Sequence, residues 1–224
     1  MTGVQTCALP IYNRYFKYYE HRDMLGAFEA IDRVEARFAE CFGRAYTGPV
    51  EAVSCDDAEA VLVTLGSIAG LARESVARLR EQGKRVGLLR IRYMRPFPAK
   101  LIAEALAGAA AVGVLEKDIS FGAEGTVFTN VNSALQQAGC MVPTFNFVGG
   151  LGGDDITSAQ MDAMFDALLD SVGERGRDDA AAGRSCDDAS TGQGVGLGRV
   201  SFLGIDFPVA SQSACGDDCE EGAR

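Results

Sequence analysis

Short apolar runs alternate with amphipathic segments through the middle of the chain. The apolar runs are 61–65, 86–91, 111–115 and 142–147, and between them apolar residues recur every three or four positions. The runs predict buried strands, and the spacing between them predicts helices. Strands separated by helices imply right-handed crossovers, so we expect an α/β fold with a mainly parallel sheet and flanking helices.

Four helices are predicted, at 67–82, from about 98, at 124–138 and from 157. Pro98 suits a first helical position, and Gly139 suits the residue that follows a helix. Thr157 and Gln160 have the spacing of a capping box. The helix that begins near Pro98 is expected to bury Leu101, Ile102 and Leu106.

The turns after the four runs carry an ordered set of residues. They include Thr64-Leu65-Gly66-Ser67, Arg92-Tyr93-Met94-Arg95-Pro96, Glu116-Lys117-Asp118-Ile119-Ser120-Phe121-Gly122-Ala123-Glu124-Gly125 and Gly149-Gly150-Leu151-Gly152-Gly153. In a parallel sheet all four turns lie at the carboxyl ends of the strands, where ligands and partners tend to bind.

In this order and at these distances, the turns resemble the alpha subunits of the thiamine-diphosphate-dependent 2-oxoacid:ferredoxin oxidoreductases, pyruvate synthase in particular. The resemblance covers about residues 12–170 and lies in the domain that is similar to the carboxyl-terminal domain of transketolase. It implies an enzyme that decarboxylates pyruvate oxidatively, passes electrons to ferredoxin and forms acetyl-coenzyme A.

The resemblance also implies how the cofactors and partners are distributed. Thiamine diphosphate, Mg²⁺ and iron–sulfur clusters serve the parent complex, and the partners are its other subunits, with ferredoxin and coenzyme A reached through the complex. The cluster cysteines and the diphosphate–Mg²⁺ motif lie elsewhere in the family and are absent from this sequence. We therefore expect no catalytic or cofactor-binding residue here, an inactive isolated chain, and a role in structure and subunit assembly.

Two alternatives stay open at this point. The chain could be a free-standing nucleotide- or partner-binding α/β module without redox activity, or it could belong to the same enzyme class and act on another 2-oxoacid. In the family the substrate is chosen by another domain, so the sequence does not decide between 2-oxoacids.

The chain divides into four parts. Residues 1–11 resemble translated sequencing-adapter read-through and are expected to be a non-native leader. Residues 12–58 hold an amphipathic helix, which resembles a remnant of the preceding pyrimidine-binding domain, followed by a linker at 43–57. Residues 59–171 form the α/β domain. Residues 172–224 are an acidic Gly- and Asp-rich tail, expected to be disordered over about 173–198, with a strand-like island at 199–205.

Composition narrows the possible partners. The net charge is −10, and residues 154–224 hold five Lys and Arg against fifteen Asp and Glu, which argues against nucleic-acid binding. No apolar run is long enough to span a membrane.

Seven cysteines without paired spacing predict reduced thiols in a cytoplasmic protein. Cys215 and Cys219 alone cannot complete a metal site, and none is expected.

Three arginines form the first candidate site. Arg90 and Arg92 share one side of a predicted strand end, and Arg95 follows in the turn. Guanidinium groups there could bind a phosphate of coenzyme A or a carboxylate of a partner subunit. We favour ion pairs within the domain or across a subunit interface.

The turn after the third run is the second candidate. Gly122 and Gly125 could present backbone N–H groups to a phosphate, but no Walker motif accompanies them, and close packing or a subunit contact is favoured. Glu116, Asp118 and Glu124 could act as acid–base groups. Glu124 is explained by a position in the first helical turn, and no direct catalytic role is expected for these carboxylates.

Overall fold

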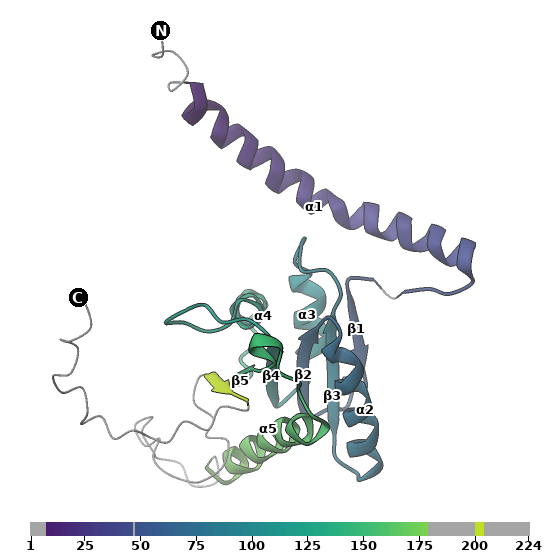
Figure 1. Cartoon of the computed structure of the whole chain (residues 1–224), viewed down its shortest axis with the longest axis vertical. Helices are drawn as coiled ribbons and strands as arrows, with labels where there is room; N and C mark the ends of the chain where they lie inside the picture. Colours follow the sequence, from purple (N-terminus) through teal and green to yellow (C-terminus); the bar gives the residue numbers. More distant parts are fainter. Residues whose placement is uncertain (1–7, 47, 179–199, 204–224) are drawn as a thin grey trace, which may run out of the picture.

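A mainly parallel sheet forms the centre of the protein (Figure 1). The computed structural model describes residues 8–46, 48–178 and 200–203. Six strands are arranged in the order β1-β3-β2-β4-β5-β6, and every neighbouring pair is parallel except β1 and β3. Their bounds are β1 Val50–Val53, β2 Ala60–Leu65, β3 Val86–Ile91, β4 Ala111–Glu116, β5 Thr144–Val148 and β6 Val200–Phe202. The expected α/β class is confirmed.

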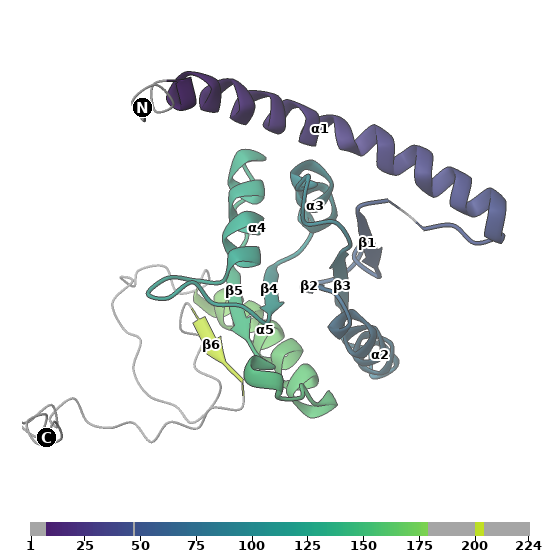
Figure 2. The same ribbon diagram turned by 45° about the horizontal axis from the view of Figure 1, so that its top comes forward.

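The central strands are apolar throughout because both faces of the sheet are covered. Val63 of β2 lies beside Leu89 of β3 and Val114 of β4, and all three are fully buried. Helices α2 (Ile68–Glu81) and α5 (Ser158–Asp178) cover one face, and helices α3 (Ala99–Leu106) and α4 (Thr126–Gln137) cover the other (Figure 2). Continuous apolar strands of this kind are typical of buried parallel sheets.

The predicted helix ends are largely confirmed. Gly139 follows α4 with φ +69°, a conformation that favours glycine. Before α5, the Thr157 N–H donates to Gln160 Oε1 at 2.8 Å, and the Gln160 N–H donates to Thr157 Oγ1 at 3.2 Å. These two bonds are the reciprocal contacts of a capping box.

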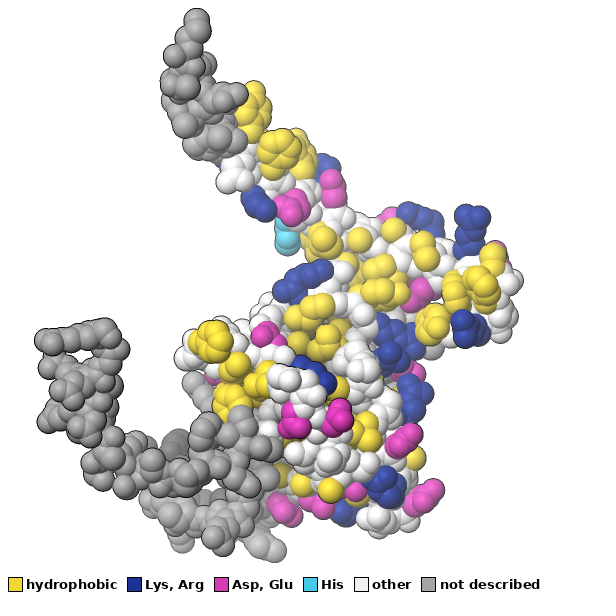
Figure 3. All heavy atoms as spheres, viewed as in Figure 1, with side chains coloured by type: hydrophobic (Ala, Val, Ile, Leu, Met, Phe, Trp, Pro, Cys, Tyr) yellow, Lys and Arg dark blue, Asp and Glu magenta, His cyan; other side chains and the backbone are white. Residues whose placement is uncertain are grey.

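Helix α1 (Ala8–Phe42) runs for 35 residues along the outside of the sheet and its covering helices (Figures 1 and 2). Its carboxyl-terminal half contacts the loops before β1 and after β3, because Glu35 accepts hydrogen bonds from the Gly48 N–H at 3.0 Å and the Tyr93 hydroxyl at 3.2 Å. Its amino-terminal half exposes large aromatic side chains, visible in yellow in Figure 3. They are Tyr12, Tyr15, Phe16, Tyr18 and Tyr19.

Several local expectations are corrected by the structure. The segment 43–57, expected to be a linker, contains β1, which pairs with β3 at the edge of the sheet. Helix α4 begins at Thr126, so Glu124 lies outside its first turn. Leu101, expected to be buried, is 41% exposed. Helix α1 begins at Ala8, within the segment 1–11. The expectation that this segment is a non-native leader stays a prediction.

The tail is described in part. Helix α5 continues to Asp178, beyond the expected start of disorder at Gly173, and the predicted island forms β6, parallel to β5. Residues 179–199 and 204–224, including Cys215 and Cys219, lie outside the described residues. In the part of the chain that is described, no helix is long and apolar enough to cross a membrane.

Gly113 sets how closely α5 can pack on the sheet. A Cβ at this position would lie 2.8 Å from Phe147 Cε2 and 2.9 Å from Leu168 Cδ1. We expect Gly113→Ala to lower the free energy of unfolding by about 1–3 kcal/mol, as overpacked cores do. Urea denaturation of the full chain measures this. Gly70→Ala is the control: its Cβ would meet open space within α2, so a gain of about 0.5–1 kcal/mol is expected. An unchanged stability for Gly113→Ala would contradict this close packing.

Candidate functional site

The order of the strands creates a crevice between β2 and β4. Strand β2 is followed in the chain by β3, which lies on one side of it, while β4 lies on its other side. The connections from β2 and β3 therefore leave toward opposite faces of the sheet. In α/β folds, ligands commonly bind at the carboxyl ends of strands at such a switch point.

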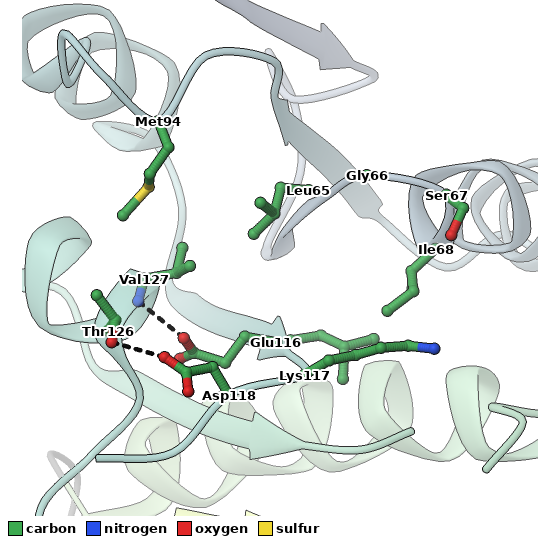
Figure 4. Close-up of a pocket in the computed structure, with 11 residues that line it drawn as sticks. Leu65, Gly66, Ser67, Ile68, Met94, Glu116, Lys117, Asp118, Thr126 and Val127 are labelled. Carbon is green, nitrogen blue, oxygen red and sulfur yellow. Dashed lines mark hydrogen bonds between the residues drawn. The ribbon is translucent and has the colours of Figure 1, made fainter. Parts of the chain in front are cut away.

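A pocket of about 430 Å³ occupies this crevice (Figure 4). Its walls are largely apolar and come from the ends of β2 and β4, the start of α2 and α4, and the turn after β3. The apolar side chains are Leu65, Ile68, Met94, Leu115 and Val127, and the charged ones are Glu116, Lys117 and Asp118. Pockets with apolar walls and a few polar groups are the usual form of a small-molecule site.

Glu116 is the buried charged residue of this pocket. It is the last residue of β4 and is 2% exposed. Its Oε2 accepts the Val127 N–H at 2.7 Å, and its Oε1 accepts the Phe128 N–H at 3.2 Å. The carboxyl group thus satisfies two N–H groups in the first turn of α4, which otherwise have no partner within the helix.

Asn146 of β5 connects this carboxyl group to the turn before α4. Its Nδ2 donates to Glu116 Oε1 at 2.9 Å, and its Oδ1 accepts the Gly125 N–H at 2.8 Å. Gly125 is the N-cap residue of α4, and a Cβ there would lie 1.9 Å from Glu116 Oε1. The close approach of the carboxyl group therefore explains the glycine.

Burial raises the pKa of Glu116. The bonds from the backbone of Val127 and Phe128 and from Asn146 act in the opposite direction, but burial has the larger effect. The group therefore retains its proton to higher pH than an exposed glutamate. Its contacts are those of a group that holds β4, β5 and α4 together.

The second group of candidates lies at the end of β3. Arg92 Nη2 donates to Glu51 Oε2 at 3.0 Å, and Arg90 Nη1 lies 3.6 Å from the same oxygen. Arg73 of α2 donates to Glu51 Oε1 at 2.6 Å. Burial alone would raise the pKa of Glu51, but the arginines Arg73 and Arg92 lower it below its ordinary value. The structure therefore brings Arg90 and Arg92 together around a carboxylate.

Arg95 does not join this group. Its Nη1 donates to the carbonyl oxygen of Met94 at 2.7 Å, and its guanidinium lies 6.0 Å from the ring centre of Phe97. Gly122, Glu124 and Gly125 belong to the loop between β4 and α4, on the other side of β2 from Arg90. The candidate residues thus form two separate groups.

Sequence reasoning missed three partners in these groups: Glu51, Arg73 and Asn146. Glu51 lies in a strand of four residues, too short to show a period, within a segment expected to be a linker. Asn146 interrupts an apolar run, and a buried amide in such a run signals a hydrogen-bond network. That signal was available in the sequence.

Known proteins similar to this chain point to one family. Residues 58–161 match the family described as pyruvate:ferredoxin oxidoreductase core domain II. Pyruvate synthase subunit PorA of Methanothermobacter thermautotrophicus is 39% identical over 155 residues, which is 69% of this chain and 39% of the relative. Ketoisovalerate oxidoreductase subunit VorA of Pyrococcus abyssi is 37% identical over 152 residues, 66% of this chain and 38% of the relative. The resemblance inferred from the four turns is confirmed.

Two solved structures also match parts of the fold. A 2-oxoglutarate:ferredoxin oxidoreductase from Magnetococcus marinus, with 2-oxoglutarate, coenzyme A and succinyl-CoA bound, has a TM-score of 0.43 and 18% identity over 55% of this chain and 20% of that chain. A split-gene transketolase has a TM-score of 0.46 and 16% identity, over 57% of this chain and 45% of that chain. The chain spans about two fifths of the length of the curated relatives named above.

Substitution of Gly125 tests the packing of Glu116. We expect Gly125→Ala to lower the free energy of unfolding by about 2 kcal/mol or more, because the new methyl group must displace a buried, hydrogen-bonded carboxyl group. Chemical denaturation of the full chain measures the loss. Gly108→Ala is a matched control, since its Cβ would meet open space. Equal stability of the two variants would show that Glu116 does not occupy this position.

The pKa of Glu116 predicts a dependence of stability on pH. The pKa of Glu116 in the folded protein is raised above the ordinary value of 4.5. The contribution of this group to the free energy of unfolding is therefore fully present below pH 4.5 and is lost as pH rises through the folded pKa. Glu116→Gln cannot ionise. The free energy of unfolding of the wild type should therefore fall relative to that of Glu116→Gln as pH rises, by at most about 1.4 kcal/mol per pH unit.

Urea denaturation at several pH values between 4 and 8 provides the measurement. Glu104→Gln, at an exposed position in α3, is the control and should follow the wild type closely. The raised pKa would be contradicted if the free energy of unfolding of the wild type stayed constant, or increased, relative to that of Glu116→Gln as pH rises.

Proposed function

We propose that this chain, whose residues 58–161 belong to the pyruvate:ferredoxin oxidoreductase core domain II family, is part of the alpha subunit of a pyruvate:ferredoxin oxidoreductase. The reaction converts pyruvate and coenzyme A to acetyl-coenzyme A and carbon dioxide, and two electrons reduce ferredoxin. The observation that carries the proposal is the family match from β2 to the start of α5, joined to 39% identity with a pyruvate synthase subunit.

The part that this domain plays is structural. The reaction of the parent complex requires thiamine diphosphate, Mg²⁺ and iron–sulfur clusters, and we assign these groups to other parts of the complex. The described residues contain no group of three or more His, Cys, Asp or Glu side chains able to hold a metal ion. Glu116, the buried acid of the switch-point pocket, is already held by the start of α4 and by Asn146.

Assembly into a larger enzyme accounts for exposed aromatic side chains on α1 that a free-standing module would leave uncovered. The amino-terminal half of α1 exposes Tyr12, Phe16 and Tyr19 on one side of the helix, and such a row of aromatic side chains is typical of a surface that another domain or another protein covers. In the parent complex that cover is either the preceding domain of the same subunit or a neighbouring subunit. The partners are then the other subunits, with ferredoxin and coenzyme A bound elsewhere in a cytoplasmic complex. No nucleic acid or membrane takes part.

A different 2-oxoacid is the second candidate. Identity to the ketoisovalerate oxidoreductase subunit is 37%, close to the 39% found for the pyruvate synthase subunit. Two relatives with different named substrates therefore match this domain almost equally well. The domain supports the reaction class more strongly than the identity of the 2-oxoacid.

An exchange of segments tests the proposal. In the PorA subunit of Methanothermobacter thermautotrophicus, the matching segment is replaced by residues 58–171 of this chain. We expect the complex to assemble and to reduce ferredoxin with pyruvate, because the domain supplies packing surfaces and no catalytic group. The same exchange with Gly113→Ala and Gly125→Ala should assemble less well.

An assembled chimera without activity would contradict the purely structural role. The isolated 224-residue chain provides a second measurement, since isothermal titration with thiamine diphosphate and Mg²⁺ should show no binding. A micromolar dissociation constant would overturn the assignment of these cofactors to other parts of the complex.

A further inference from the structure

Three arginines share a single carboxylate where β3 leaves the sheet. All the ion pairs that the described residues show for Arg73, Arg90 and Arg92 go to Glu51. Three guanidinium groups stay charged at any physiological pH, and Glu51 balances one of these charges. The cluster therefore carries an excess of two positive charges, and we name Arg73, Arg90 and Arg92 the arginine cluster.

Two donors of this cluster have no acceptor. Arg90 Nε and Arg92 Nη1 are buried and make no hydrogen bond. Buried donors of this kind are rare in folded proteins, because nothing replaces the water that they lost. The excess charge and the unused donors are two separate observations, and both indicate that further acceptor oxygens belong at this place.

The exposed border of the cluster consists of Tyr46 and Arg73. The Arg92 guanidinium lies 5.0 Å from the centre of the Tyr46 ring, and Tyr46 is 46% exposed. The Arg73 side chain is 48% exposed. Tyrosine and arginine are enriched at the centres of protein interfaces. The Arg90 side chain is itself 36% exposed, so solvent reaches the cluster beside these two residues.

We propose that the arginine cluster is a docking site for an acidic segment of a partner polypeptide. The carboxylates of that segment accept hydrogen bonds from Arg90 and Arg92 and balance the excess charge, while Tyr46 packs beside them. Planar guanidinium groups suit carboxylates because they can donate two parallel bonds. This inference goes beyond the proposed function, because binding of an acidic segment to the arginine cluster can be measured on this chain without the rest of the enzyme.

A polypeptide fits this surface better than a phosphate-bearing cofactor does. Small-molecule sites are concave, and the pocket of about 430 Å³ at the switch point is lined by residues outside the arginine cluster. The cluster lies at the edge of the sheet, beside the short strand β1. A partner segment can reach such an edge without entering a cavity.

Titration of the full chain with a hexaglutamate peptide tests this proposal. At low salt we expect saturable binding by isothermal titration, and a shift of the Arg90 Nε–H signal in ¹⁵N–¹H spectra. Arg73→Gln should weaken binding at least fivefold, because it removes an exposed charge of the cluster. Arg78→Gln is the matched control: it lies on the same helix, and its partner is Asp162. It should leave the affinity unchanged.

Hexaglutamine and coenzyme A complete the comparison. Neither should compete with hexaglutamate at similar concentrations. Arg92→Lys keeps the charge but removes the planar group, and a loss of affinity in this variant at unchanged thermal stability supports direct contact. Equal binding by Arg73→Gln and Arg78→Gln, or tighter binding of coenzyme A than of hexaglutamate, would overturn the proposal.

The acidic carboxyl-terminal segment of the chain itself is the remaining competitor. A chain shortened after Gly204 should bind hexaglutamate with the affinity of the full chain. A clear rise in affinity would show that residues 205–224 occupy the cluster, and the partner would then not be another polypeptide. None of these measurements depends on activity, so their failure would leave the exchange of segments in PorA unaffected.

Discussion

The side chain of Glu116 holds together the edge of the sheet at which the parallel strands end. It ends β4, accepts two N–H groups of α4 and binds the side-chain amide of Asn146 in β5. A carboxyl group buried in this way is stable only while its donors stay in place. Two strands and a helix are therefore held in one arrangement, and Gly125 is required because the carboxyl group fills the space of a side chain.

The sequence predicted the core of the fold because the parallel strands are buried on both faces. Such strands are short, apolar and separated by amphipathic helices, which a periodic pattern reveals directly. Strand β1 escaped prediction because four residues at an edge carry no pattern, and its place depends on pairing with β3. Leu101 was expected to be buried but is 41% exposed. Helical periodicity shows which side of a helix is apolar, but it does not show which residues at the border of that side reach solvent.

The candidate site was predictable only in part. The alternation of side chains along a strand was enough to place Arg90 and Arg92 on one side of β3. Their partner Glu51 could not be found in this way, because the contact joins residues about forty positions apart through an antiparallel pair. Gly125 is predicted to be a packing position, and the structure places the carboxyl group of Glu116 where its Cβ would be. Glu116 lies on a different element, β4.

The two ends of the carboxyl edge differ in how completely their polar groups are satisfied, and this difference bears on function. At β4 and β5 the polar groups bond to one another, so the N–H groups at the start of α4 have their acceptor within the same domain. At β3 the positive charges exceed the carboxylate available to them, and two donors remain unused. Acceptor oxygens for these two donors can come from another polypeptide, and this is the basis of the docking site proposed at the arginine cluster.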